Sequence, residues 1–318
     1  MQFIRAMVSV CCAGLMLAGN TAQAQNYPTK LVRILTAGTG GGNDVNARIM
    51  ALGLTGALGQ QVIVENRPTT LLPDAVARSA PDGYTLMVYS GGLWIQPFLS
   101  QVNYDPGRDF TPITYVAKSP LIVVVHPSVP VNSIKDLIAL AKAKPGALNY
   151  TTGGTGSASH LGPELFKQMT GVDMVRVPYK NGSQEIADLL SGQVQLTFGG
   201  GGTFASHIKS GKLRGVAVTS SQPSVLFPNL PTVASSGLPG YESTQIYGLF
   251  SPAKVPDAII RRLNQDSVRY LQTEDAKQKI LAAGMEAVGS SQEEFAAVVK
   301  ADMAKWGKLI KELGIHED

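Results

Sequence analysis

Strand-like and helix-like segments alternate along the whole chain, and this alternation constrains the fold more than any other feature. Short runs rich in apolar and β-branched residues have the length and spacing of strands. They cover residues 31–35, 61–65, 85–89, 121–125, 148–151, 174–177, 196–198, 215–218 and 246–250. Helices are expected between them, near 45–58, 133–143, 164–170, 185–191 and 204–210. The pattern predicts an α/β protein in which helices cover a mostly parallel sheet.

The first residues have the pattern of a secretory signal peptide. A basic start with Arg5 precedes an apolar stretch at 6–19 that is too short to span a bilayer, and Ala-Gln-Ala at 22–24 suits cleavage. We therefore expect residues 1–24 to be removed and the protein to be exported without a membrane anchor. Both cysteines, Cys11 and Cys12, lie in this segment, so no disulfide or thiol chemistry is expected in the mature chain.

Polar turns at 126–130 and 237–240 divide the remaining chain into three parts. About 290 residues remain after the signal peptide, more than one domain usually holds. The turns predict a discontinuous first domain, residues 25–124 and 246–318, and a second domain, residues 125–245, with two connecting strands as a hinge. Near the C-terminus, Ser291 and Glu294 predict a capping box, and the helix after it carries an apolar stripe in which Trp306 is expected to be core.

Two turns rich in glycine, serine and threonine each lie between a predicted strand and a predicted helix. The first is TAGTGGGND at 36–44, and the second is TTGGTGSASH at 151–160. A helix N-terminus has backbone N–H groups without internal partners and a partial positive charge, so both turns suit a carboxylate or phosphate. We expect Asn43 or Asp44 to cap the first helix, which leaves the amides of 40–42 free for a ligand. The alternative, that the turns are only tight connections, stays open.

The residues match no nucleotide or catalytic motif. A phosphate-binding P-loop needs Gly-Lys followed by Ser or Thr, whereas Asn43 and Asp44 follow Gly42. Ser157, Ser159 and His160 are too close in sequence for a catalytic triad, and we expect His160 to close its turn or touch the ligand. Scattered basic residues and 7% aromatic content argue against a nucleic-acid surface, and the histidine spacing argues against a metal site.

Short motifs along nearly the whole mature length resemble those of one family. They are YP at 27–28, GGGND at 40–44 with AR at 47–48, VENRP at 64–68, APDGYTL at 80–86, YDP at 104–106 with DF at 109–110, VPYK at 177–180, GKLR at 211–214, PTV at 231–233 and GLPGY at 237–241. In this order they make the chain similar to the Bug-type (TctC-like) periplasmic solute-binding proteins of tripartite tricarboxylate transporters.

The resemblance implies a two-domain clamshell of the type II periplasmic-binding-protein form, a Venus flytrap that closes on a small carboxylate. It implies a monomer in the periplasm, without cofactor or catalysis, that works with the membrane subunits of such a transporter. Main-chain N–H groups and hydroxyls of both turns are expected to hold the ligand. The candidate ligand contacts are Thr36, Thr39, Gly42, Asn43, Asp44, Ser90, Gly91, Trp94, Thr152, Gly156, Ser157, Ala158, Ser159, His160, Phe198 and Gly200.

Departures from the family pattern bear on the identity of the ligand. Four glycines at 199–202 replace a usual Asp-Asn, and Trp94 stands where relatives usually have a small residue. Together they predict a roomier and more aromatic pocket, which favours a flat ligand such as terephthalate. The alternatives are that Trp94 packs under a loop, that the ligand is an aliphatic di- or tricarboxylate, that the protein is a ligand sensor for a two-component system, or that it is a periplasmic hydrolase.

Overall fold

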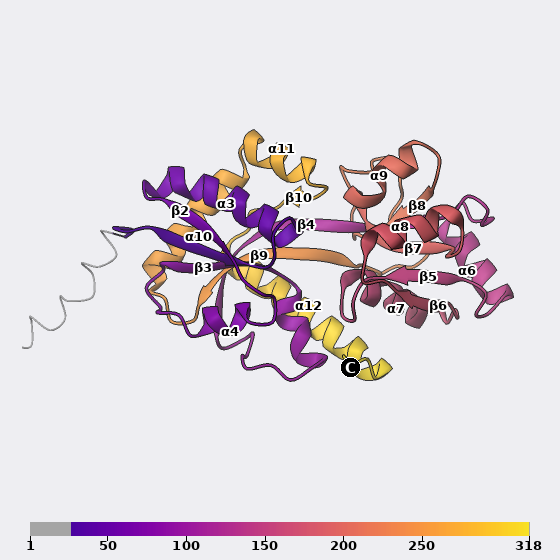
Figure 1. Ribbon diagram of the computed structural model, residues 1–318, viewed down its shortest axis with the longest axis horizontal. Helices are drawn as coiled ribbons and strands as arrows, with labels where there is room; N and C mark the ends of the chain where they lie inside the picture. Colours follow the sequence, from indigo (N-terminus) through magenta and orange to yellow (C-terminus); the bar gives the residue numbers. More distant parts are fainter. Residues whose placement is uncertain (1–26, 318) are drawn as a thin grey trace, which may run out of the picture.

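Two lobes lie side by side along the long axis of the protein and are joined by two long strands (Figure 1). The structure is a computed structural model that describes residues 27–317, so the expected signal peptide lies outside the described residues. The joining strands are β4 (Phe110–Val125) and β9 (Thr244–Pro252). They pair antiparallel, from Phe110 opposite Pro252 to Pro120 opposite Thr244, so the sheet continues from one lobe into the other.

In the first lobe, helices cover both faces of a sheet with the order β2–β1–β3–β9–β4. Its other strands are β1 (Val32–Thr36), β2 (Val62–Asn66), β3 (Thr85–Ser90) and the short β10 (Glu286–Ala287). One face carries α3 (Gly42–Leu58), α10 (Asp257–Leu271) and α11 (Glu274–Ala282). The other face carries α4 (Leu72–Ala77), α5 (Gly92–Ile95), the 3-10 turn η1 (Gln96–Phe98) and α12 (Gln292–Leu313). Strand side chains alternate between the faces, so Val88 packs on the α3 side and Met87 on the α12 side.

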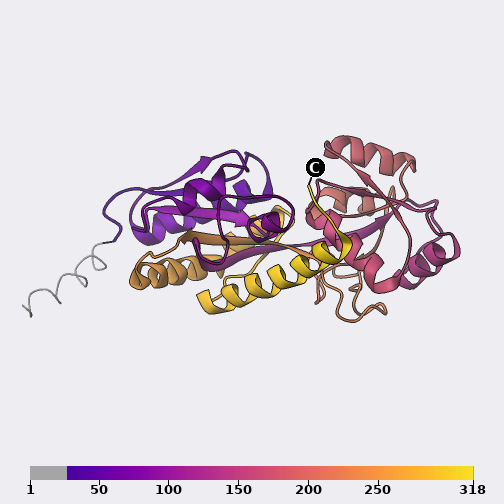
Figure 2. The same ribbon diagram turned by 90° about the horizontal axis from the view of Figure 1, so that it is seen from below.

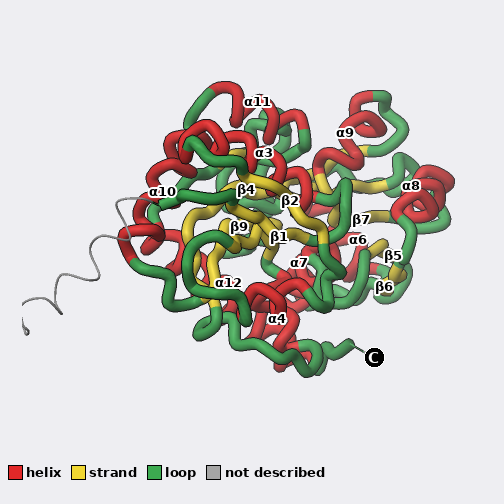
Figure 3. Tube along the Cα trace, turned by 60° about the vertical axis from the view of Figure 1, so that its left-hand side comes forward, coloured by secondary structure: helices red, strands yellow, loops and turns green. Residues whose placement is uncertain are grey.

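The second lobe repeats this layering around β7 (Leu196–Gly200), β5 (Asn149–Thr152), β6 (Val175–Pro178) and β8 (Arg214–Val218). Its helices are α6 (Ile134–Ala143), α7 (Ala158–Thr170), α8 (Gly182–Ser191) and α9 (Gly201–Lys209). Val123 of β4 packs in a core with α6 and α7, and Val124 packs in a core with α8 and α9. Figure 3 shows the strands of both lobes enclosed by helices and loops. Within residues 27–317, no helix is long and apolar enough to cross a membrane.

The prediction of a mostly parallel sheet holds only for strands away from the connection. β1 pairs in parallel with β2 and β3, and β5 pairs in parallel with β6 and β7. In contrast, β9 is antiparallel to β3 and β4, and β4 is antiparallel to β7 and β8. The reason is topological, because a strand that leaves a lobe and a strand that returns to it run in opposite directions.

The C-terminal helix α12 runs along the first lobe toward the second (Figure 2). Its predicted capping box is confirmed, since Oγ of Ser291 accepts a hydrogen bond from the N–H of Glu294 and the Glu294 carboxylate accepts one from the N–H of Ser291. Near its other end, Glu312 accepts a 2.7 Å hydrogen bond from Gln168 of α7. The helix therefore contacts both lobes.

Candidate functional site

A cavity of about 280 Å³ lies between the two lobes. The first lobe contributes the end of β3, α5, η1 and α12, the second lobe contributes the second glycine-rich turn, and β9 runs between them. The lining residues are Thr69, Tyr89, Ser90, Gly91, Gly92, Ile95, Gln96, Leu99, Gly154, Thr155, Gly156, Ser157, Ala158, Leu161, Thr244, Gln245, Ile246, Asp302 and Trp306. Of the predicted ligand contacts, Ser90, Gly91, Gly156, Ser157 and Ala158 thus border the cavity.

The second turn is held in shape by its own side chains. Gly156 has a φ of +78°, which glycine adopts without the steric cost that other residues incur. The N–H of Gly153 donates to Oγ of Ser159 at 3.0 Å, and the N–H of Gly156 donates to Nδ1 of His160 at 3.1 Å. Ser159 and His160 therefore close the turn, which is one of the two roles expected of His160. Thr155 and Ser157 border the cavity, and Oγ of Ser157 also lies within hydrogen-bond distance of Oγ of Ser159, at 3.1 Å.

His160 holds this turn as a neutral imidazole. The ring is 2% exposed, and burial, with a smaller contribution from Arg176, lowers the pKa of His160 to about 4. Because Nδ1 accepts the hydrogen bond from Gly156, protonation there would break the turn. The neutral ring is thus a structural element of the site at neutral pH.

The second turn also reaches across to the first lobe. A Cβ added at Gly156 would overlap Cδ1 of Leu99 and lie 3.6 Å from Cγ2 of Ile95, both from the segment around η1. Leu99 is buried, so this contact is part of a packed surface between the lobes. The cavity is therefore closed on one side by direct contact of the second turn with the first lobe.

The first turn is built differently from the sequence-based expectation. Helix α3 begins at Gly42 rather than near Val45, and its N-cap Gly41 has no side-chain cap. Asp44 lies inside the first helical turn, where its Oδ2 accepts a 2.9 Å hydrogen bond from the N–H of Gly40. The Gly40 amide is therefore bound within the protein, and the expectation that it is free for a ligand is wrong.

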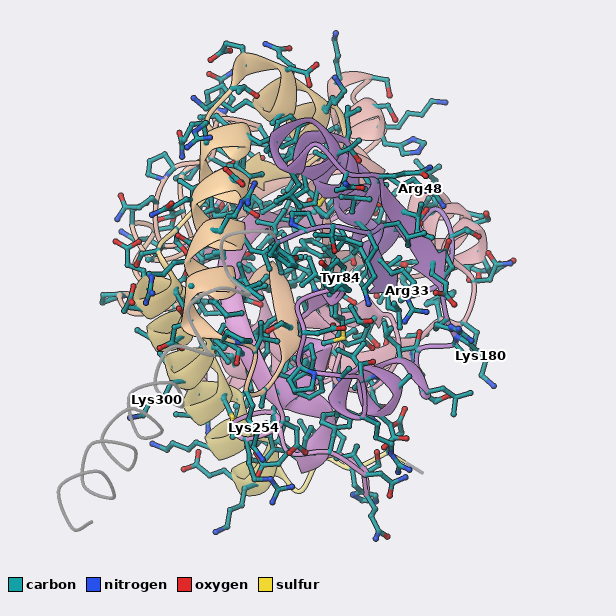
Figure 4. The ribbon with its side chains drawn as sticks, turned by 90° about the vertical axis from the view of Figure 1, so that its left-hand side faces the viewer. Arg33, Arg48, Tyr84, Lys180, Lys254 and Lys300 are labelled. Carbon is teal, nitrogen blue, oxygen red and sulfur yellow. The ribbon has the colours of Figure 1, made fainter. Side chains whose placement is uncertain are left out.

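Two further side chains complete the hydrogen bonds of Asp44. Arg48, at the surface on α3 (Figure 4), donates Nε–H to Oδ2 at 3.0 Å, and Asn66 donates to Oδ1 at 2.8 Å. Burial on its own raises the pKa of Asp44, but the hydrogen bonds from Arg48, Gly40 and Asn66 outweigh it and lower the pKa to about 2. An ionised carboxylate of the protein itself thus occupies the neighbourhood of this helix N-terminus.

The first turn meets β9 on the face away from the cavity. A Cβ at Gly42 would overlap the ring of Tyr247, whereas Ile246, one residue earlier on β9, lines the cavity. Successive side chains of a strand point to opposite faces of the sheet. Within residues 27–317 the lining of this cavity includes neither Thr39 nor Asn43, so the cavity does not support the expectation of two turns around one ligand, which stays a prediction.

Trp94, expected beside the ligand, lies in the core. It is fully buried, and its Nε1–H donates to Oδ2 of Asp302 on α12 at 2.9 Å. Trp94 of α5 thus packs against α12 and β9, which matches neither the expected ligand contact nor packing under a loop. Thr36 is also fully buried, and its hydroxyl donates to the carbonyl of Val88 at 3.1 Å, so this side chain serves the sheet.

The segment around Gly200 is filled by neighbouring side chains and does not enlarge the cavity. A Cβ at Gly199 would overlap Phe204, and one at Gly201 would lie 2.5 Å from the ring of Phe227. Phe198 is fully buried against Phe166 in the core of the second lobe. Gly199 and Gly201 make room for these aromatic rings, so these two glycines give no support to the expectation of a roomier pocket.

Other lining residues gave no signal in the sequence. Trp306 was expected to be core, yet its 3% exposed surface borders the cavity together with Tyr89, whose pKa is raised to about 12 by burial. Asp302 is buried at the cavity wall and is paired with Lys305 at 3.2 Å. The helical stripe that contains Trp306 was visible in the sequence, but which part of it faces a cavity depends on the second lobe.

Two lobes are joined by antiparallel strands and enclose a small cavity, and a turn at the start of a helix borders this cavity. These features define a two-lobed solute-binding protein. The described residues contain no group of three or more potential metal-ligating side chains that could hold an ion.

Comparisons with known proteins extend this assignment. The sequence of residues 46–315 matches the family described as tripartite tricarboxylate transporter family receptor, and the chain belongs to this family. Protein BugT of Bordetella pertussis is 32% identical over 301 residues, which cover 92% of this chain and 91% of BugT.

Solved structures agree. Rpa4515 of R. palustris, solved with adipate, is 33% identical with a TM-score of 0.76, covering 91% of this chain and 99% of its own. MatC of Rhodopseudomonas palustris, with bound malate, is 25% identical with a TM-score of 0.73, covering 89% and 100%. The expected α/β, two-domain periplasmic-binding-protein fold and the resemblance to Bug-type proteins are thereby confirmed. Members of the family are solute-binding proteins that bind small carboxylates and work with transporter components.

Proposed function

We propose that this protein is a periplasmic receptor that captures a small carboxylate between its two lobes and delivers it, unchanged, to the membrane subunits of a tripartite tricarboxylate transporter. The observation that carries the proposal is the second turn, where Gly154–Ala158 border a cavity that the first lobe helps to enclose. The amides of Gly156 and Ser157 are bound within the turn, so the hydroxyls and the remaining amides of this segment are the groups that suit a carboxylate. Hydrogen bonds to a charged group contribute about 1.5 to 3 kcal/mol each. Adipate and malate in structures of relatives support the ligand class.

The delivery step follows from contacts made by both lobes. We infer that residues 25–124 with 246–318 form one moving body and residues 125–245 the other, with β4 and β9 as the hinge. A ligand that touches both bodies favours the closed state by its differential affinity, and a transporter can then distinguish loaded from empty receptor. A sensor for a two-component system would use the same closure, and transport is favoured here by the family match.

The ligand is either a flat aromatic dicarboxylate or an aliphatic diacid. An aromatic dicarboxylate such as terephthalate is supported by Tyr89 and Trp306, two aromatic residues that border the cavity. The support from Trp94 is lost, since that ring is in the core. An aliphatic diacid is supported by the adipate and malate of the relatives.

A thermal-shift screen with adipate, malate, succinate and terephthalate tests the proposal. A ligand at ~100 times its dissociation constant stabilises the folded state by about 2.7 kcal/mol, which raises the melting temperature measurably. The neutral diamides of the same acids are the matched controls and are expected to give a clearly smaller shift at the same concentration. Mass spectrometry of the recovered acid should show it unchanged. A screen without any acid-specific shift, or turnover of the acid, contradicts the proposed function.

A further inference from the structure

The cavity between the lobes lacks a positive charge of its own. Among its lining residues in the described part of the chain, the only charged side chain is that of Asp302, and this carboxylate is held by Trp94 and Lys305. A ligand carboxylate that loses water on entering such a cavity needs charge compensation. A cation behind the lining can supply this compensation, and Lys305, the cation beside Trp306, is already paired with Asp302.

Arg176 of β6 is a cation in that position. Its Nε–H donates to Oγ1 of Thr152 at 3.0 Å, and one terminal nitrogen donates to Oγ1 of Thr155 at 3.3 Å. The side chain is partly buried, and the ion pairs found in residues 27–317 do not include it. A guanidinium remains protonated at all relevant pH values, so a positive charge without an ion-pair partner is separated from the cavity by the Thr155 hydroxyl.

The two threonines differ in whether their hydroxyl can reach a ligand in the cavity. Thr152 is fully buried, so its hydroxyl is confined behind the turn, whereas Thr155 is partly exposed and borders the cavity. A hydroxyl has one donor hydrogen and two acceptor positions. Because Oγ1 of Thr155 already accepts from Arg176, its own hydrogen is free to point into the cavity, and the neighbouring charge strengthens the bond it donates.

We propose that Arg176 is the specificity-determining residue of this site, which selects an anionic carboxylate over a neutral group of the same shape by polarising the Thr155 hydroxyl from behind. The inference rests on the proposed function, since it names the charge that the carboxylate meets. It places the carboxylate at the Thr155 side of the cavity, away from Asp302. It also explains how a cavity without a lining cation can serve an anion.

The test compares acid and amide affinities in charge variants. Arg176→Met, Arg176→Lys and wild type are titrated by calorimetry with adipate, malate and terephthalate and with their diamides. Arg214→Met is the matched control, because Arg214 is a partly buried arginine of the same lobe that donates to the carbonyls of Val129 and Val131. In Arg176→Met we expect at least a tenfold loss of acid affinity with amide affinity unchanged, and in Arg176→Lys a partial recovery. Arg214→Met should keep the wild-type preference.

The outcomes separate this inference from the proposed function. Wild-type affinity for the acids in Arg176→Met, or an equal loss of acid and amide affinity, overturns the role of Arg176 and leaves the function standing. If wild type binds none of the three acids, the proposed function fails and the inference with it. If Arg176→Met does not fold, Thr155→Val and Thr155→Ser decide: the valine variant should lose the preference for the acid and the serine variant should keep it, and the opposite result overturns the proposal.

Discussion

Gly156→Ala tests whether closure of the lobes depends on the contact between the second turn and Leu99. The change has two costs. An L-residue in the left-handed region costs roughly 1 to 2 kcal/mol, and the native φ is +78°. The added Cβ also overlaps Leu99 of the other lobe, and displacing a packed side chain costs about 1 to 3 kcal/mol. Only the second cost is relieved when the lobes open, so it reduces affinity rather than stability.

A matched glycine at the other end of α7 separates the two costs. Gly171 ends α7 with a φ of +66°, and a Cβ there meets nothing within 4 Å. Gly171→Ala should therefore lower the free energy of unfolding by roughly 1 to 2 kcal/mol without changing affinity. Gly156→Ala should show a similar loss in urea unfolding and, in calorimetry with adipate, malate and terephthalate, an additional 5- to 150-fold weaker binding, which corresponds to about 1 to 3 kcal/mol. Equal affinities of the two variants for every acid bound by wild type would refute this reasoning.

Three further changes test other parts of the account. Burial lowers the pKa of His160 from 6.5 to about 4, so as the pH falls the unfolded chain is protonated before the folded one. The free energy of unfolding should therefore fall by about 3 kcal/mol between pH 7 and pH 4, and urea unfolding of His160→Asn should lack this pH-dependent loss. Trp94→Phe leaves buried Asp302 without one donor and should cost about 1 to 3 kcal/mol in urea unfolding, while a large change in ligand affinity would contradict the core position of Trp94. Gly284→Ala introduces a side chain at a φ of +74°, which should lower the melting temperature in differential scanning calorimetry. Its Cβ would also lie 2.8 Å from Cα of Gly202 in the other lobe, so acid binding in calorimetry should weaken as well, and wild-type affinity would contradict this contact between the lobes.

Local elements were predictable because their signals are local. The strand runs, the capping box of Ser291 and Glu294, and the turn at Gly156 all depend on residues a few positions apart. The direction of β9 was not predictable, since apolar runs carry no information on which neighbour a strand joins. Helices α10 and α11 were not assigned at all, although their apolar faces complete the first core.

The second turn of the candidate site could be predicted from the sequence, but the buried partners of the predicted residues could not. Trp94 could be assigned to a pocket or to the core with equal reason until its partner Asp302, 208 residues away in the chain, was located. Likewise, whether Asp44 faces a ligand or binds its own turn depends on Asn66, which lies at the end of β2, 22 residues further along the chain. Arg176 shows no sequence signal, because its role depends on the parallel pairing of β5 and β6.

The central claim is that a carboxylate binds in the cavity beside Trp306. The chain contains two tryptophans, so in Trp94→Phe the fluorescence comes from Trp306 alone. Titration of this variant with adipate, malate and terephthalate should give a saturable change in emission with at least one acid and a much weaker response to its diamide at the same concentration. In Trp306→Phe, where only buried Trp94 remains, the same acid should leave the emission nearly constant. No response from Trp306 to any acid that calorimetry shows to bind, or an equal response from both variants, would contradict the assignment of the ligand to this cavity.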